Sequence, residues 1–376
     1  LLGFSEVREL RLVHAALFLL VYLAALAGNL LIVAVTVLDR RLHTPMYFFL
    51  RNLSVIDLCY ISVTVPKSIH ASLTDRRSIS FLGCASQLFS VILFGGSEVL
   101  LLTAMSYDRY AAICLPLRYE VIMDRGACGK MAAASWLGGG LFALMTSSGT
   151  FSPPFCGSVL IRQFFCDISS VVRLSCSETH LVVDVIVVTG ALLVFTCFVS
   201  IAVSYTRIFR AVLRMPVTEG RAKAFSTCLP HLIVTTLFFT SASFGALHPP
   251  SDSSSALDRL VSVFYTVVPP TLNPLIYSLR NRDVKAAVGR FFCDIASMVR
   301  LACSETQLIV NVLLFTGALL SFSCFVYMVI SYVHIFRAGP QWGCDVGHGN
   351  YPTQGPQGPR LRLVRTGHNE ASQPNL

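Results

Sequence analysis

Long apolar segments separated by short polar stretches dominate the chain. Seven of them precede residue 290: Leu12–Leu38, Met46–Pro66, Leu82–Cys114, Met131–Thr150, Leu181–Tyr205, Leu229–Leu247 and Leu260–Leu279. A helix needs about 20 mostly apolar residues to cross a bilayer, and these runs are too long for barrel strands. Only helices and closed barrels satisfy their backbone polar groups in lipid. The pattern therefore predicts an all-α membrane protein built on a bundle of seven transmembrane helices.

An eighth apolar run, Leu308–Ile335, lies in a repeated segment. Residues Phe164–Ala211 and Phe291–Ala338 are identical at 31 of 48 aligned positions. Beyond them the chain is polar and rich in Gly, Pro and Gln, which is typical of disorder. We therefore predict a seven-helix domain over 1–290, a partial duplicate of an outer loop and the fifth helix over 291–338 with an extra C-terminal hydrophobic helix, and a disordered tail over 339–376.

The charges support this topology and exclude a nucleic-acid partner. The chain is 54% hydrophobic and 13% charged, whereas a soluble domain carries about 25% charged residues. The net charge is +9, but fourteen basic residues fall in the connections that we place inside and eight in those that we place outside. This is the positive-inside bias, and it predicts a multi-pass protein whose N-terminus is extracellular.

Ionisable residues inside spans are costly and usually functional. Asp57 lies in the second run, Glu98 in the third, and the pair Asp108-Arg109 near the inner end of the third. Glu98 and Arg109 are eleven residues apart, which places them within about 20° of one helix face. The alternative is that these groups only hydrogen-bond to neighbouring helices.

Four cysteines are predicted on the outer side. Cys156, Cys166 and Cys176 are spaced ten apart in a long loop, and Cys84 lies at the outer end of the third run. An oxidising compartment favours two disulfides, but the spacing does not choose among the three pairings. A zinc site is disfavoured because there is no C-x-x-C pair and no close histidine pattern.

No catalytic motif is present, so we predict neither enzyme activity nor a cofactor. The sequence lacks H-E-x-x-H, a P-loop and G-x-S-x-G. His14 and His231 lie in or beside apolar runs, and we interpret them as packing residues. The glycines of "WLGGGLF" in the fourth run favour close helix contacts.

Four segments carry a family resemblance: "HTPMYFFLRNLSVIDLCY", "MSYDRYAAICLPLRY", "KAFSTCLPHL" and "PPTLNPLIYSLRNRDVKAAV". Together and in this order they resemble the signatures of the olfactory receptor family, which belongs to the rhodopsin-like G-protein-coupled receptors. The resemblance runs from Leu1 to about Arg290. It implies a receptor of the ciliary plasma membrane, embedded in membrane lipid. It also implies a small volatile odorant as ligand and a heterotrimeric stimulatory G protein that raises cyclic AMP.

The resemblance also implies roles for single residues. The inner switch that meets the G protein is Asp108, Arg109 and Tyr110, and the hinge of the seventh helix is Asn273, Pro274 and Tyr277. Asp57 and Glu98 resemble the acids of an allosteric sodium site, with Asn29 nearby. The implied disulfides are Cys84–Cys166 and Cys156–Cys176. One departure is Phe238-Phe239-Thr240, where the family usually has Phe-Tyr-Gly, so a tyrosine hydroxyl is missing.

The topology places an odorant pocket in the outer halves of the helices. Odorants are mostly apolar, so the site should be apolar with few polar anchors. The candidate lining residues are Val91, Ile92, Gly95, Gly96, Val187, Phe239, Ala242 and Thr266. For each of them, plain helix packing is the competing interpretation.

Two other interpretations stay open. An eight-span transporter needs polar residues along a path that includes the eighth run, where Leu308–Ile335 offers only Asn311 and His334. A non-signalling fusion or pseudogene product, formed when a neighbouring receptor gene is joined to the first, fits the truncated duplicate. Under the receptor interpretation, residues 291–376 add nothing to recognition or coupling.

Overall fold

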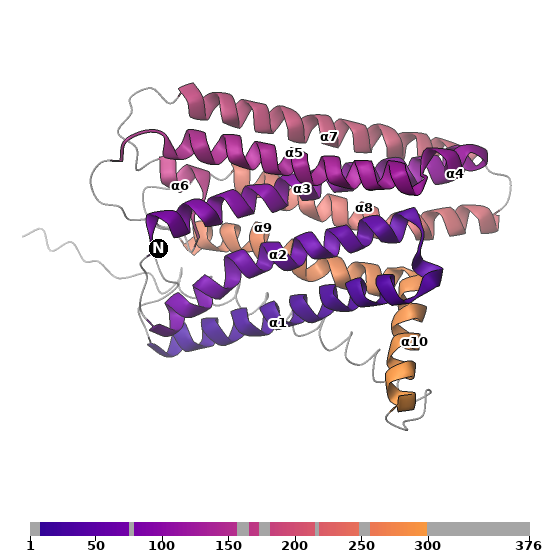
Figure 1. Cartoon of the computed structure of the whole chain (residues 1–376), viewed down its shortest axis with the longest axis horizontal. Coiled ribbons are helices and arrows are strands. Elements are labelled where there is room, and N and C mark those ends of the chain that lie inside the picture. Colours follow the sequence, from indigo (N-terminus) through magenta and orange to yellow (C-terminus); the bar gives the residue numbers. More distant parts are fainter. Residues whose placement is uncertain are drawn as a thin grey trace, which may run out of the picture. The chain divides into compact units, whose positions relative to one another are not determined.

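The computed structural model describes residues 8–74, 79–155, 165–172, 181–214, 218–247 and 256–298, all within one compact unit, Leu1–Arg337. Seven long helices form the bundle (Figure 1): α1 (Arg8–Leu38), α2 (Pro45–Thr74), α3 (Phe81–Cys114), α5 (Arg125–Phe151), α7 (Leu181–Leu213), α8 (Thr218–Leu247) and α9 (Ala256–Arg280). Shorter helices lie at their ends: η1 (Arg40–Leu42), η2 (Pro116–Arg118), α4 (Tyr119–Ile122), α6 (Ile168–Val172) and α10 (Arg282–Met298).

Each of the seven apolar runs lies within one long helix, so the predicted all-α seven-helix fold is confirmed. By length and composition, five of the described helices are apolar enough to cross a membrane, and α5 and α9 are not among them. Polar and helix-weakening residues lower the hydropathy of both: α5 carries three adjacent glycines and α9 carries three prolines. The eighth run, Leu308–Ile335, lies outside the described residues.

Helix boundaries follow local chemistry. Pro45 is the first residue of α2. A backbone N–H at this position has no partner within the helix, so proline loses no hydrogen bond there. Pro116 opens η2 two residues after α3 ends. Asp124 caps α5 by accepting a hydrogen bond from the Ala127 amide at 2.7 Å.

Glycines allow close contact between α3 and α5. A Cβ atom added to Gly96 would lie 3.3 Å from the Gly139 Cα, and one added to Gly139 would lie 2.3 Å from the Ser97 Oγ. The small residues therefore let the two backbones approach, as interpreted from the sequence. Figure 1 shows α5 between α3 and α7, and α9 packs against α1, α2 and α8.

Helix α10, the last one in the described residues, is hydrogen-bonded to the inner ends of α1 and α2. The Tyr47 hydroxyl donates to Asp283 at 2.8 Å, and the Arg290 Nε donates to Asp39 at 3.0 Å. The hydrogen bond from Arg290 lowers the pKa of Asp39. Phe291 and Phe292 pack against the inner core, so the domain boundary that we place at residue 290 falls within a continuous helix.

Candidate functional site

A single amide joins the two buried acids. Asp57 on α2 is 0% exposed and Glu98 on α3 is 2% exposed. The Asn273 Nδ2 of α9 lies 3.1 and 3.3 Å from the two Asp57 oxygens and 3.3 Å from the Glu98 Oε1. Three residues that are far apart in the sequence therefore meet at one point inside the bundle.

The oxygen atoms around this point suit a hard cation. The Asn273 Oδ1 is buried and has no hydrogen-bond partner in the described part of the chain, and carboxylate and amide oxygens are the ligands that such cations prefer. Neither acid forms a salt bridge with another described residue. No group of three His, Cys, Asp or Glu side chains gathers within the described ranges, so a cation here would have two carboxylates.

Asn29 lies near Asn273 and Pro274, but its amide nitrogen hydrogen-bonds to the backbone of α1 and α9 and not to Asp57 or Glu98. The Asn29 Nδ2 donates to the Pro270 carbonyl at 2.9 Å and to the Ala25 carbonyl at 3.0 Å. Pro274 has no N–H, so it leaves the Pro270 carbonyl without a helical donor. Asn29 replaces that donor, and Gly28 admits the Pro274 ring, because a Cβ there would lie 3.0 Å from the ring Cγ.

At the inner end of α3, Asp108 holds two partners. It accepts a hydrogen bond from the Arg109 Nε at 2.9 Å and one from the Tyr119 hydroxyl of α4 at 2.7 Å. The Asp108 side chain is 1% exposed and that of Arg109 is 12% exposed. Burial, together with the charge of Asp108, raises the pKa of Tyr119, so the phenol stays a donor at neutral pH.

Tyr110, the third residue of this motif, contacts α7. The Arg207 Nη1 lies 3.4 Å from the Tyr110 hydroxyl, and the guanidinium carbon lies 5.7 Å from the centre of the Tyr110 ring. Arg207 of α7 therefore contacts α3 through a weak hydrogen bond and a cation–π interaction with Tyr110.

The predicted inner motifs converge on one small void of about 10 Å³. Its walls come from the inner parts of α2, α3, α8 and α9 and from the residue that joins α9 to α10: Met46, Met105, Asp108, Arg109, Thr227, Pro230, His231, Tyr277 and Asn281. This volume is near the minimum for one water molecule. The Tyr277 hydroxyl is buried and without a hydrogen-bond partner among the described residues. The structure thus brings together the Asp108-Arg109 and Asn273–Tyr277 motifs.

His231 is a functional candidate that sequence reasoning missed. Its Nε2 lies 3.1 Å from the Leu102 carbonyl, and its Nδ1 lies 2.6 Å from the Tyr205 hydroxyl. A carbonyl only accepts, so Nε2 carries the proton and Nδ1 accepts from the tyrosine. The ring therefore links α8 to α3 and α7. Its apolar neighbours in the sequence indicated packing, and its position in "KAFSTCLPHL" was the available signal.

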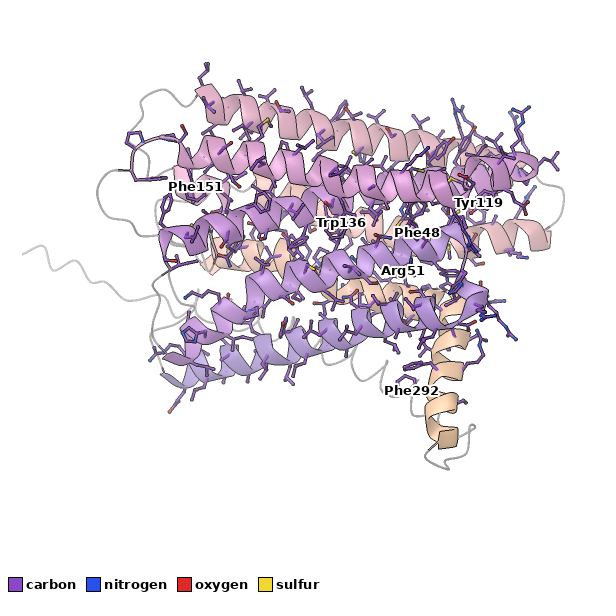
Figure 2. All side chains as sticks on the ribbon, viewed as in Figure 1. Phe48, Arg51, Tyr119, Trp136, Phe151 and Phe292 are labelled. Atoms are coloured by element: carbon purple, nitrogen blue, oxygen red, sulfur yellow. A yellow bond between two sulfur atoms is a disulfide. The ribbon has the colours of Figure 1, made fainter. Side chains whose placement is uncertain are left out.

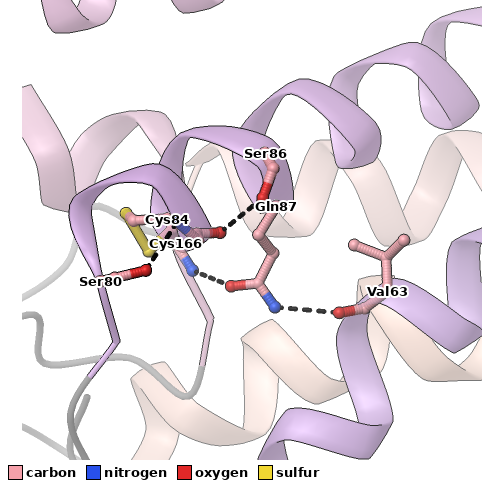
Figure 3. Close-up of a disulfide and its surroundings, with 7 residues drawn as sticks. Val63, Ser80, Cys84, Ser86, Gln87 and Cys166 are labelled. Carbon is pink, nitrogen blue, oxygen red and sulfur yellow. Dashed lines mark hydrogen bonds between the residues drawn. A yellow bond between two sulfur atoms is a disulfide. The ribbon is translucent and has the colours of Figure 1, made fainter.

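At the opposite end of α3, a disulfide joins Cys84 to Cys166 across 82 residues (Figure 3). This is the pairing that the family resemblance implies. Gln87 supports it: its Oε1 accepts from the Cys166 amide at 3.0 Å, and its Nε2 donates to the Val63 carbonyl at 3.0 Å. Cys156 and Cys176 lie outside the described residues.

The candidate pocket residues divide into two groups. Val91 packs against the outer core that contains Phe165, and Thr266 is fully buried, donating to the Ser262 carbonyl at 2.6 Å. The Phe239 ring on α8 lies 5.4 Å from that of Phe198 on α7. Ile92, Gly95 and Ala242 are half-buried.

Two further candidates face elsewhere. Gly96 lies against Gly139 of α5, as described above, which is the packing role that competes with a pocket role. Val187 is 53% exposed on α7, most of which faces outward. Neither geometry favours a place in a pocket between α3, α7 and α8.

Comparisons with known proteins agree with these motifs. A family model described as "Olfactory receptor" matches residues 18–295. Human olfactory receptor 14A2 is 55% identical over 290 residues, which is 77% of this chain and 92% of that protein. Human olfactory receptor 14L1 is 56% identical over 290 residues, which is 77% of this chain and 89% of that protein.

Among solved structures, squid rhodopsin superimposes with a TM-score of 0.57 at 18% identity, covering 79% of this chain and 90% of that one. At this identity the likeness shows the shared seven-helix fold alone. The family match and the relatives above 50% identity show more: the chain belongs to the olfactory receptor family, whose members are multi-pass membrane receptors, not enzymes, that bind odorants and signal through G proteins.

Proposed function

We propose that this receptor works at the plasma membrane, recognises a small volatile odorant in the outer half of the bundle and activates a stimulatory G protein that raises cyclic AMP. The observation that carries this proposal is the convergence of Arg109, His231 and Tyr277 on one inner void. A switch of this kind needs an element with two arrangements, and we assign that role to α8, whose His231 is hydrogen-bonded to both α3 and α7.

The disulfide supports an extracellular N-terminus. Disulfides persist in oxidising compartments, so the Cys84 end of α3 faces outside. Cys84 and Asp108 are 24 residues apart on one helix, or about 36 Å. Asp108 then faces the cytoplasm, and α1 begins on the outer side because α1 and α2 each cross the membrane once before Cys84.

The odorant pocket is proposed to lie among Val91, Ile92, Phe239, Ala242 and Thr266, with Gly95 leaving space beside them. Five of these six residues carry no side-chain polar atom, which suits an apolar ligand. The Thr266 hydroxyl already donates to Ser262, so it is left to accept a hydrogen bond from the odorant. Phe239 in place of the family's tyrosine removes a polar anchor and favours apolar odorants.

Activation follows from a difference in affinity between two bundle arrangements. An odorant that binds more tightly when α8 has moved outward shifts the population towards that arrangement. Movement of α8 would break the hydrogen bonds of His231 to Tyr205 and Leu102. Arg109, released from Asp108, would then be free to meet the G protein.

The acidic pair is proposed to bind one sodium ion in the resting arrangement. Two carboxylates around one amide in a low dielectric do not both stay charged without a cation. Asp57, Glu98 and the orphaned Asn273 Oδ1 supply oxygen ligands from α2, α3 and α9. Because the three helices must stay in register to hold the ion, binding favours the resting bundle.

The domain proposal keeps residues 1–290 as the receptor, 291–338 as a partial duplicate and 339–376 as a tail. The family match to residue 295 and the 290-residue alignments with relatives support a receptor that ends near the start of the second copy. A join with a neighbouring receptor gene explains a duplicate that lacks a sixth helix. A non-signalling fusion product remains the second candidate, favoured by the unusual length after residue 295.

The test is an odorant panel applied to cells that express the receptor, with cyclic AMP as the readout. We expect an odorant-dependent rise that requires the stimulatory α subunit. A receptor that is labelled at the surface, responds to odorant through an inhibitory or other G protein, and never raises cyclic AMP contradicts the proposed coupling.

A further inference from the structure

A cavity of about 720 Å³ opens at the inner end of the bundle, apart from the acidic pair and the inner void. It lies between the end of α1, the start of α2, α4 and the start of α5. Figure 2 shows Phe48, Arg51 and Tyr119 at the same end of the helices, near α4. Nothing in the proposed odorant or G-protein chemistry uses this space, so its lining residues need their own explanation.

Arg51 is the residue that points to a ligand. It is half-buried, its guanidinium carbon lies 5.4 Å from the centre of the Phe48 ring, and it forms no hydrogen bond or ion pair with any residue that the structure describes. Arg51 stands six residues into α2, about 9 Å along the axis. At that depth a guanidinium reaches the headgroup boundary, where its planar fork suits a phosphate.

A second cation and two helix ends add to the attraction for an anion. Arg125 is exposed, lines the cavity and is the first residue of α5. Both α2 and α5 begin at the cavity wall, through Pro45 and Arg125, so both helix dipoles present their positive ends there. These dipoles only reinforce the arginines.

The lining also carries two carboxylates, which restrict the ligand. Asp124 is occupied in capping the Ala127 amide, and Glu120 is exposed. Both would repel a simple anion and attract an ammonium group. The rest of the wall is mixed: it has the apolar side chains of Leu42, Pro45, Phe48, Met123 and Cys128 and the polar ones of Thr36, His43, Thr44 and Tyr119. The lining therefore complements a headgroup that carries phosphate, carboxylate and ammonium above a lipid backbone.

We propose that this cavity binds the headgroup of an inner-leaflet phosphatidylserine, with the phosphate on Arg51, the carboxylate on Arg125 and the ammonium beside Glu120. Anionic phosphatidylserine is a component of the cytoplasmic leaflet. Tyr119 lines the same cavity and holds Asp108, so the bound lipid braces the resting form of the inner switch. The inference stands independently of the odorant.

The test compares lipid stabilisation of the full-length receptor in phosphatidylcholine nanodiscs that contain added phosphatidylserine or phosphatidylglycerol. The readout is the melting temperature as a function of lipid fraction. We expect phosphatidylserine to raise it more than phosphatidylglycerol does. Arg51→Gln should weaken the apparent affinity for phosphatidylserine about tenfold, since a charge-assisted hydrogen bond is lost. Arg118→Gln, which removes an exposed inner arginine outside the lining, is the matched control and should keep the full effect.

Two more variants keep the test decisive. Arg125→Gln covers the case in which Arg51→Gln fails to fold, and it should also weaken phosphatidylserine binding. Glu120→Gln should reduce the preference over phosphatidylglycerol. The proposal is overturned if Arg51→Gln and Arg118→Gln behave alike, if the two lipids stabilise equally, or if inorganic phosphate in solution replaces phosphatidylserine.

Discussion

The Tyr119 hydroxyl donates a 2.7 Å hydrogen bond to Asp108, the carboxylate that also holds Arg109. An inner-loop residue and the switch arginine therefore share one buried acceptor. Any partner that draws α4 away leaves Asp108 with Arg109 alone, and any partner that draws Arg109 away leaves it with Tyr119. The inner loop is thus coupled to the switch before a G protein arrives.

Tyr119→Phe tests this coupling. Losing one hydrogen bond to a carboxylate destabilises the resting arrangement, so we expect basal cyclic AMP to rise, by up to about tenfold, at equal surface expression. Tyr107→Phe is the control, because Tyr107 lies on α3 next to Asp108 and is 41% exposed. Basal signalling that is unchanged in Tyr119→Phe argues against a role for the shared acceptor.

Asp57→Asn tests the proposed sodium site. In the wild type, replacing sodium by a bulky organic cation should raise agonist potency about fivefold or more, within the usual range of coupling between two sites. Asp57→Asn should abolish this shift, because one of the two carboxylates is lost. Asp184→Asn, which removes an exposed carboxylate on α7, should keep it. Equal sodium responses in all three receptors exclude the acidic pair as the site.

The outer cysteines give a prediction about connectivity. Peptide mapping without reduction should find Cys84 joined to Cys166 and Cys156 joined to Cys176. Removing a native disulfide costs about 2–5 kcal/mol, so Cys84→Ser should also lower surface expression, whereas Cys59→Ser should not, because Cys59 is a free cysteine on α2. A peptide that links Cys84 to Cys156 would falsify the pairing.

Truncation tests the domain proposal. A stop after Met298 keeps all of α10 and removes the rest of the duplicate and the tail, so signalling should persist or improve through better surface delivery. A stop after Arg290 also removes Phe291 and Phe292 from the inner core, and we expect lower expression from it. If the receptor cut after Met298 reaches the surface and no longer signals, the duplicate is functional.

Sequence reasoning worked where one physical effect dominates. Length and hydropathy predict the seven helices, because only helices and closed barrels satisfy the backbone in lipid and these runs are too long for barrel strands. The contacts of Asn273, His231 and Tyr119 depend on how helices cross, which periodicity does not encode. The tetrapeptide Phe-Cys-Asp-Ile occurs twice in this chain and adopts a different structure each time. In the first copy it begins at Phe165 and its cysteine forms the outer disulfide, whereas in the second copy it begins at Phe292 and lies in helix α10.

The most direct test is Arg109→Ala, measured as odorant-driven cyclic AMP against surface labelling. Arg109 is hydrogen-bonded to Asp108 and lines the inner void together with residues of α8. Arg118→Ala, which removes an exposed arginine nine residues on, is the control and should signal normally. We predict that Arg109→Ala reaches the surface and gives no odorant-driven cyclic AMP. A normal response from that variant would contradict the assignment of Arg109 as the coupling switch.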